Sequence, residues 1–148
     1  MNRRFGPLPD PARRYTPRPG AYAIIAAPDG VLVTFQEEPR REFQLPGGGV
    51  DPGEAVLPAL HREVREETGH TIHGLRRLGM FHRFTYMPEY DLWAQKLCHV
   101  YLARIGRRLG PPSEPGHWAL ILPWDVAAKK LAVSGDRHFL RYALSLGV

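Results

Sequence analysis

A triplet of glycines, Gly47 to Gly49, leads directly into a segment with helical periodicity, and this combination constrains the fold more than any other feature of the chain. Apolar residues recur at three- and four-residue spacing over residues 56–68, which predicts an amphipathic helix. Glu63, Glu66 and Glu67 are separated by steps of three and four, so on that helix their side chains fall within about 100° of one another. The sequence therefore predicts a glycine loop followed by a helix with one acidic face.

The acidic face has two interpretations. Like charges at this spacing cost about a few tenths of a kcal/mol per pair in an isolated helix. One interpretation is a solvated glutamate face balanced by Arg62 and Arg65. The other is a divalent cation, because Mg²⁺ binds carboxylate oxygens and leaves its remaining positions to water and substrate phosphates. The glycine triplet favours the second interpretation, since backbone without side chains can approach a cation or an anion closely.

The rest of the chain has the pattern of an α/β domain. Strands are expected on both sides of a turn at 28–30, at 42–45, 77–86 and 92–104, and after a loop at 110–118; helices are expected over 125–133, capped by Asp125, and over 137–146. Strands interspersed with helices predict a layered α/β fold. Residues 1–19 contain five prolines and predict a basic, proline-rich arm, with residues 20–148 as a single domain.

Composition narrows the classes of protein to which the chain can belong. A length of 148 residues with 43% apolar content predicts one folded domain with a single core. No stretch approaches 18 consecutive apolar residues, so we expect neither a membrane span nor a membrane partner. The amino terminus lacks an apolar signal region, and the single Cys98 is expected to be a buried thiol. These features favour a cytoplasmic location.

The net charge of +5 raises the question of a nucleic-acid partner. Five arginines lie in the proline-rich arm, and the other basic residues are scattered among acids. A nucleic-acid binder more often has a continuous basic stripe interleaved with aromatic side chains. Nucleic acid is therefore not expected as the main partner. We expect instead that a mildly basic surface attracts a polyphosphate.

The glycine loop and the helix together resemble a known family. The pattern G-x5-E-x7-R-E-U-x-E-E-x-G-U of the Nudix hydrolases is matched from Gly48 to position 70, and its fixed residues are Gly48, Glu54, Arg62, Glu63, Glu66, Glu67 and Gly69. His70 is the one departure, because the family usually has a bulky aliphatic residue there. Ile72 is expected to supply that apolar contact instead.

The resemblance implies the Nudix fold, an α/β/α sandwich with a mixed β-sheet in a single domain. It also implies a MutT-like, Mg²⁺- or Mn²⁺-dependent pyrophosphohydrolase, a hydrolase acting on phosphorus-containing acid anhydrides. Such an enzyme uses metal-activated water to cleave a diphosphate bond in a nucleoside diphosphate linked to another group. The expected partner is a small-molecule nucleotide, and the chain is expected to be a monomer or homodimer.

Site residues follow from the resemblance by position. The expected metal ligands are Glu63, Glu66, Glu67 and the backbone carbonyl of Gly47. Glu63 is similar to the residue that serves as ligand or general base, and Arg62 is expected to orient the carboxylates. Arg62, Glu63 and Glu66 are the catalytic candidates. A carboxylate near a cation stays ionised and can accept a proton from the attacking water.

Four further residues of the pattern have supporting roles. Gly48 and Gly49 are expected to let backbone reach the substrate. Glu54 is expected to support the loop and the helix. Gly69 stands where a helix C-cap belongs. The polyphosphate electrophile is itself negatively charged, so its oxygens must be neutralised for water to attack.

Outside the pattern the candidates are single residues. Glu114 is expected as a further metal ligand, because the loop around it resembles the proline-glycine-tryptophan segment of nucleoside triphosphate hydrolases in this family. Tyr86 and Trp118 are candidates for binding a nucleobase by stacking. Tyr86 lies near where dinucleoside polyphosphate hydrolases carry a tyrosine, and Pro88 lies slightly beyond where ADP-ribose hydrolases carry a proline.

The compact length and the Glu114 loop favour a nucleoside triphosphate or a damaged nucleotide as substrate. The alternatives are a dinucleoside polyphosphate, ADP-ribose and the 5′ end of an RNA bound with help from the basic arm. A Nudix module that senses a nucleotide without hydrolysing it is another alternative. The intact set of carboxylates argues against such a sensor.

Overall fold

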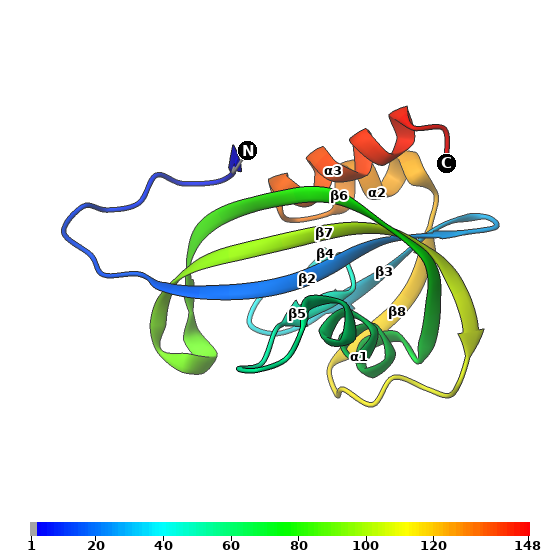
Figure 1. The fold of residues 1–148 in the computed structure, drawn as a ribbon, viewed down its shortest axis with the longest axis horizontal. Coiled ribbons are helices and arrows are strands. Elements are labelled where there is room, and N and C mark those ends of the chain that lie inside the picture. Colours follow the sequence, from blue (N-terminus) through cyan, green and yellow to red (C-terminus); the bar gives the residue numbers. More distant parts are fainter. Residues whose placement is uncertain (1–2) are drawn as a thin grey trace.

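An eight-stranded mixed sheet forms the middle layer of the computed structural model, which describes residues 3–148 (Figure 1). Helix α1 (Val56–Thr68) covers one face of this sheet, and helices α2 (Trp124–Lys130) and α3 (Ser134–Ser145) cover the other (Figure 1). This arrangement is the predicted α/β/α sandwich. Within residues 3–148 no helix is long and apolar enough to cross a membrane.

One long strand near the middle of the sheet pairs with three others. The strands of the sheet are β1 (Arg3–Arg4), β2 (Thr16–Ala27), β3 (Gly30–Gln36), β4 (Glu42–Gln44), β5 (Gly47–Gly49), β6 (His70–Met87), β7 (Leu92–Arg108) and β8 (His117–Leu122). They follow the order β1-β6-β7-β2-β3-β4, with β5 paired to β2 and β8 paired to β3. β2 runs parallel to β7 and antiparallel to β3 and β5. β2 therefore connects the β6–β7 hairpin to the glycine strand.

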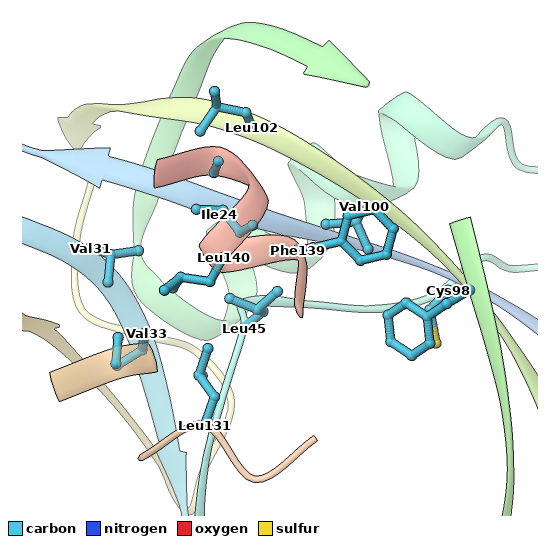
Figure 2. Close-up of a cluster of buried hydrophobic side chains, with 13 residues drawn as sticks. Ile24, Val31, Val33, Leu45, Cys98, Val100, Leu102, Leu131, Phe139 and Leu140 are labelled. Carbon is cyan, nitrogen blue, oxygen red and sulfur yellow. The ribbon is translucent and has the colours of Figure 1, made fainter. Parts of the chain in front are cut away.

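Alternation along β2 creates a separate core on each face of the sheet. Ile24 faces α2 and α3, where it packs in one apolar cluster with Leu140 (Figure 2). Ile25 points to the other face and packs in a second cluster with Leu60 of α1. Ile72 belongs to this second cluster and is 6% exposed, which confirms the predicted substitute for the apolar residue after the helix.

The β6–β7 hairpin is longer than the pattern predicted. β6 extends over His70–Met87 and β7 over Leu92–Arg108, whereas strands were expected only at 77–86 and 92–104. Register shifts interrupt the pairing three times between His70 and Gly79. Such bulges break the strict alternation of inward and outward side chains, which is the signal that a sequence pattern detects.

Both C-terminal helices begin earlier than predicted. Asp125 lies in the first turn of α2 and makes no capping hydrogen bond, because Pro123 occupies the N-cap position. α2 then ends at Lys130, short of the expected residue 133. α3 begins at Ser134 rather than at residue 137. Its second residue, Gly135, packs so closely on Phe81 that a Cβ atom there would lie 2.3 Å from the ring.

The predicted arm contacts the sheet at several points. Arg3 and Arg4 pair with β6 in parallel, and the ring of Phe5 meets the edge of Phe81 at a centroid distance of 5.5 Å. Tyr15 packs on Phe84, with ring centroids 4.8 Å apart. β2 starts at Thr16, inside the segment 1–19. The domain boundary after residue 19 stays a prediction.

Candidate active site

The glycine triplet forms β5, which places its backbone between β2 and α1. At Gly47 the backbone φ is +145°, and a Cβ atom would lie 2.1 Å from the carbonyl oxygen of Ala21. Only glycine fits this position. At Gly48 a Cβ atom would lie 2.5 Å from Oε2 of Glu63, so the missing side chain leaves room for that carboxylate. The glycine strand therefore lies directly against the acidic face of α1.

Glu67 is the most deeply buried glutamate of the site. It is 6% exposed, and its Oε1 accepts a hydrogen bond of 2.8 Å from the backbone N–H of Gly47. Burial raises the pKa of Glu67 well above its ordinary value; the Gly47 hydrogen bond opposes this, and the charges of Glu114 and Glu63 add to it. Burial disfavours the ionised form of this carboxylate, and a cation bound beside it would stabilise that form.

Arg62 holds the neighbouring carboxylates in place. Its guanidinium forms two hydrogen bonds with Glu54, of 2.8 and 2.9 Å, and one of 3.0 Å with Glu63. It also donates to the carbonyl oxygen of Gly49 at 3.1 Å. Hydrogen bonding to Arg62 lowers the pKa of Glu54 to about 2. Glu54 also accepts from the backbone N–H of Asp51, which closes the loop before α1.

Glu63 and Glu66 differ in their surroundings. Burial raises the pKa of Glu63, whose side chain is 15% exposed, although Arg62 opposes the shift. Glu66 is 43% exposed, and its carboxylate lies 3.4 Å from the Arg62 guanidinium. The helix ends at Gly69, whose left-handed backbone forms the predicted C-cap by donating to the carbonyl of Arg65.

The loop before β8 carries Glu114 to the helix. The carbonyl oxygen of Glu66 accepts backbone hydrogen bonds from Ser113, at 2.9 Å, and from Glu114, at 3.2 Å. These bonds use a carbonyl at the end of α1 that has no partner within the helix. The predicted extra carboxylate is therefore brought beside the acidic face.

His117, which the sequence pattern did not single out, joins the same cluster. Its Nδ1 lies 4.0 Å from Oε2 of Glu114. Neither of these two buried atoms has a hydrogen-bond partner. Potential ligand atoms of Glu67, Glu114 and His117 all lie within 4.8 Å of one another. The only feature of the sequence that could have indicated this role for His117 is its position three residues after Glu114.

These residues fit a divalent cation. A buried polar atom without a partner costs about 1–3 kcal/mol, and two such atoms face the buried carboxylate of Glu67. Carboxylate oxygens suit Mg²⁺ and Mn²⁺, and an imidazole nitrogen is also accepted by Mn²⁺. Glu63 lies close enough to the cluster for its charge to affect Glu67.

A cleft of about 270 Å³ opens beside this cluster. Its acidic group consists of Glu63, Glu67 and Glu114, and the glycine strand and His117 lie next to them. A second, basic group in the same cleft consists of Arg18, Arg83 and Lys96. The cleft can therefore receive a ligand that binds a cation at one group and carries negative charge at the other.

The structure does not bring Tyr86 and Trp118 to this cleft. Phe81 and Arg83 of β6 line it, so Tyr86, an odd number of residues away, points to the opposite side of the strand. Tyr86 donates a hydrogen bond to Asp91 instead. The same alternation turns Trp118 away, because its neighbour His117 faces the cleft. Stacking of a nucleobase on either ring is not supported by this geometry.

Comparison with known proteins agrees with the fold. Residues 16–143 match the model of the NUDIX domain family. The chain is 34% identical over 116 residues to the 8-oxo-(d)GTP phosphatase of Mycolicibacterium smegmatis, which covers 77% of this chain and 34% of that protein. It is 42% identical over 57 residues to the RNA pyrophosphohydrolase of Helicobacter pylori strain G27, covering 35% and 37% of the two chains.

A solved structure of a NUDIX hydrolase from Nitrosomonas europaea superimposes with a TM-score of 0.70 over 89% of this chain and 90% of that one. At 21% identity this likeness concerns the fold alone. The chain spans between about a third and a half of the length of the curated relatives that it matches.

Proposed function

Because this chain belongs to the NUDIX domain family, we propose that it is a divalent-metal-dependent pyrophosphohydrolase acting on a nucleoside polyphosphate. The observation that carries the proposal is the convergence of Glu67, Glu114 and His117 within 4.8 Å, beside Glu63 and the glycine strand. Glu114 and His117 each have one buried ligand atom without a hydrogen-bond partner, next to the buried carboxylate of Glu67, and a cation would complete this arrangement.

Glu67, Glu114 and His117 would hold the cation, with Glu63 and Glu66 as further carboxylates. Mg²⁺ is the expected ion because most of these ligands are carboxylates, and Mn²⁺ is the alternative because it accepts the imidazole of His117 more readily than Mg²⁺ does. When bound, such an ion neutralises phosphate oxygens and helps to position and deprotonate water.

Glu63 is the proposed general base. Its carboxylate lies against the glycine strand, and its Oε1 is held by Arg62 at 3.0 Å, so the proton acceptor has a fixed position. Water attacks one phosphorus of the diphosphate, its proton passes to Glu63, and the bond from that phosphorus to the bridging oxygen breaks. Gly48 leaves the Glu63 carboxylate free to reach this water, because no Cβ atom fills the space.

A nucleoside triphosphate or a damaged nucleotide is the proposed substrate. The relative from Mycolicibacterium smegmatis is named for 8-oxo-(d)GTP, and its similarity extends over 77% of this chain. The cleft also contains Asp136 and the basic group, so a ligand with both polar and anionic parts would find partners there.

The test is product release from a panel of nucleotides in the presence of Mg²⁺. We expect the wild type to hydrolyse at least one triphosphate and Glu67→Gln to lose about 100-fold or more in kcat, since it removes a proposed ligand. Glu37→Gln is the matched control, because Glu37 is exposed and lies outside the cleft. If nucleotides bind and no member of the panel is hydrolysed, the chain is a nucleotide-sensing module and not an enzyme.

A 5′-triphosphorylated RNA is the second candidate substrate. Similarity to the RNA pyrophosphohydrolase of Helicobacter pylori favours it. Basic residues of the arm also lie on aromatic rings of the β6–β7 hairpin. The Arg13 guanidinium is 3.6 Å from the centroid of Trp93. Including this RNA in the panel decides between the two: if RNA is preferred, Arg13→Met should weaken its binding and flatten its salt dependence.

A further inference from the structure

The basic group of the cleft lies on three adjacent strands. Arg18 of β2 is in register with Lys96 of β7, and Lys96 is in register with Arg83 of β6. All three side chains line the cleft that contains the acidic group. The parallel pairing of β2 with β7 therefore gathers cations from distant parts of the sequence on one surface.

These cations have no anionic partner in contact. Within residues 3–148, none of the ion pairs shorter than 4.0 Å involves Arg18, Arg83 or Lys96. Lys96 and Arg83 are half-buried, and Lys96 is surrounded closely enough for burial, followed by the charge of Arg83, to lower its pKa. Placing like charges together in a partly desolvated cleft is unfavourable unless something else offsets it.

Among residues 3–148, Asp136 is a buried carboxyl that could balance part of this charge, and the charge of Glu89 also acts on Lys96. Asp136 is 5% exposed, lines the same cleft at the start of α3, and lies near enough to feel the charges of Arg83 and Lys96. However, no ion pair within residues 3–148 joins Asp136 to Arg83 or Lys96. The basic group therefore keeps a local positive charge, although carboxyls also line other parts of the cleft.

We propose that Arg18, Arg83 and Lys96 form an anion subsite that holds phosphate oxygens of the substrate other than those at the acidic group. This subsite deepens the proposed hydrolysis and rests on it. The ligand it selects is a polyphosphate chain long enough to reach both groups, rather than a single phosphate ester.

Tyr22 lines the cleft together with both groups. Burial raises the pKa of its phenol, and the charges of Arg83, Asp136 and Glu67 also act on that pKa. Lys96 lies 5.9 Å from the centre of the Tyr22 ring. A ligand in contact with Tyr22 can therefore reach both the acidic and the basic group. Charge-assisted hydrogen bonds from the cations would fix the part of the phosphate chain that is not attacked.

The test is a calorimetric titration of the full chain with inorganic pyrophosphate in EDTA. Pyrophosphate has no base or sugar, and EDTA removes any cation, so the titration reports the basic group alone. We expect the wild type to bind and Lys96→Met and Arg83→Met each to weaken binding about tenfold or more. Lys96→Arg should retain most of the affinity, because it keeps the charge.

Lys130→Met and Arg107→Met are the controls, since both side chains are exposed and lie outside the cleft. They should bind pyrophosphate as the wild type does. Circular dichroism confirms folding. Within residues 3–148 the side chains of Lys96 and Arg83 take part in no ion pair, so both variants should fold. The proposal is overturned if the wild type does not bind pyrophosphate or if the Lys96 and Arg83 variants bind it equally well.

A nucleotide panel separates this outcome from a failure of the proposed function. If the wild type hydrolyses nothing yet binds pyrophosphate through Lys96, the subsite stands and the hydrolase proposal fails. If hydrolysis occurs and the KM of Lys96→Met equals that of the wild type, the subsite is wrong and the hydrolase proposal stands.

Discussion

Replacing Asp136 by asparagine removes a buried carboxyl near the basic group, and its effect on stability depends on pH. Asparagine keeps an oxygen that can accept the hydrogen bond from the backbone of Leu45. Burial raises the pKa of Asp136 from 3.8 to about 6, while Arg83, Lys96 and Arg137 partly oppose the shift. In the native state the Asp136 carboxyl titrates in a pH range where the same carboxyl is already ionised in the unfolded chain.

The direction in which Asp136 makes stability depend on pH follows from proton linkage. Between pH 3.8 and about 6 the native state binds more protons at Asp136 than the unfolded state, so stability falls as the pH rises. A shift of this size corresponds to about 3 kcal/mol. For a chain of this length, 1 kcal/mol moves Tm by about 2–4 °C, so the full effect is about 6–12 °C.

The assay is thermal unfolding of the wild type and of Asp136→Asn from pH 3 to pH 7 in EDTA. The Tm of the wild type should fall relative to the variant as the pH rises, with most of the change between pH 4 and 6. Glu63 and Glu67, whose pKa values are also raised, are present in both proteins and cancel in the difference. A Tm difference that is constant with pH, or that changes in the opposite direction, would refute this reasoning.

Two further substitutions test the site with matched controls. Gly48→Ala should lower kcat about tenfold with little change in Tm, because the new Cβ atom displaces the Glu63 carboxylate. Gly110→Ala, with open space around its Cβ position and outside the cleft, should behave as the wild type. Equal kcat values in the two variants would contradict the close approach of Gly48 to Glu63. His117→Ala should weaken Mn²⁺ binding about 10- to 100-fold in a paramagnetic resonance titration, and the exposed His73→Ala should not; unchanged affinity would remove His117 from the cation site.

The local parts of the fold could be predicted from the sequence because their signals lie close together in the chain. The helix over residues 56–68, its C-cap at Gly69 and the acidic face all follow from spacings of three to five residues. The limits of β6 could not be predicted, since bulges interrupt its alternation. The start of α3 was also missed, because it depends on the packing of Gly135 against Phe81.

The residues of the candidate site could be predicted only where they belong to a recognisable sequence motif. Glu114 could be expected from the loop that contains it, but the hydrogen bonds that bring it to α1 are made by backbone, which no side-chain pattern reveals. His117 was missed because a single histidine three residues after a glutamate is a weak signal. Arg18 and Lys96 lie far apart in the sequence, and only the parallel pairing of β2 with β7 brings them together.

Pyrophosphohydrolase activity can be tested by hydrolysing the preferred nucleotide in ¹⁸O-labelled water with Mg²⁺ and analysing the products by mass spectrometry. We expect cleavage of a diphosphate bond, one ¹⁸O atom in one of the two phosphate products, and loss of turnover in Glu67→Gln but not in Glu37→Gln. Equal turnover in Glu67→Gln and the wild type, or release of phosphate from a nucleoside monophosphate instead of cleavage between two phosphates, would contradict the proposed activity.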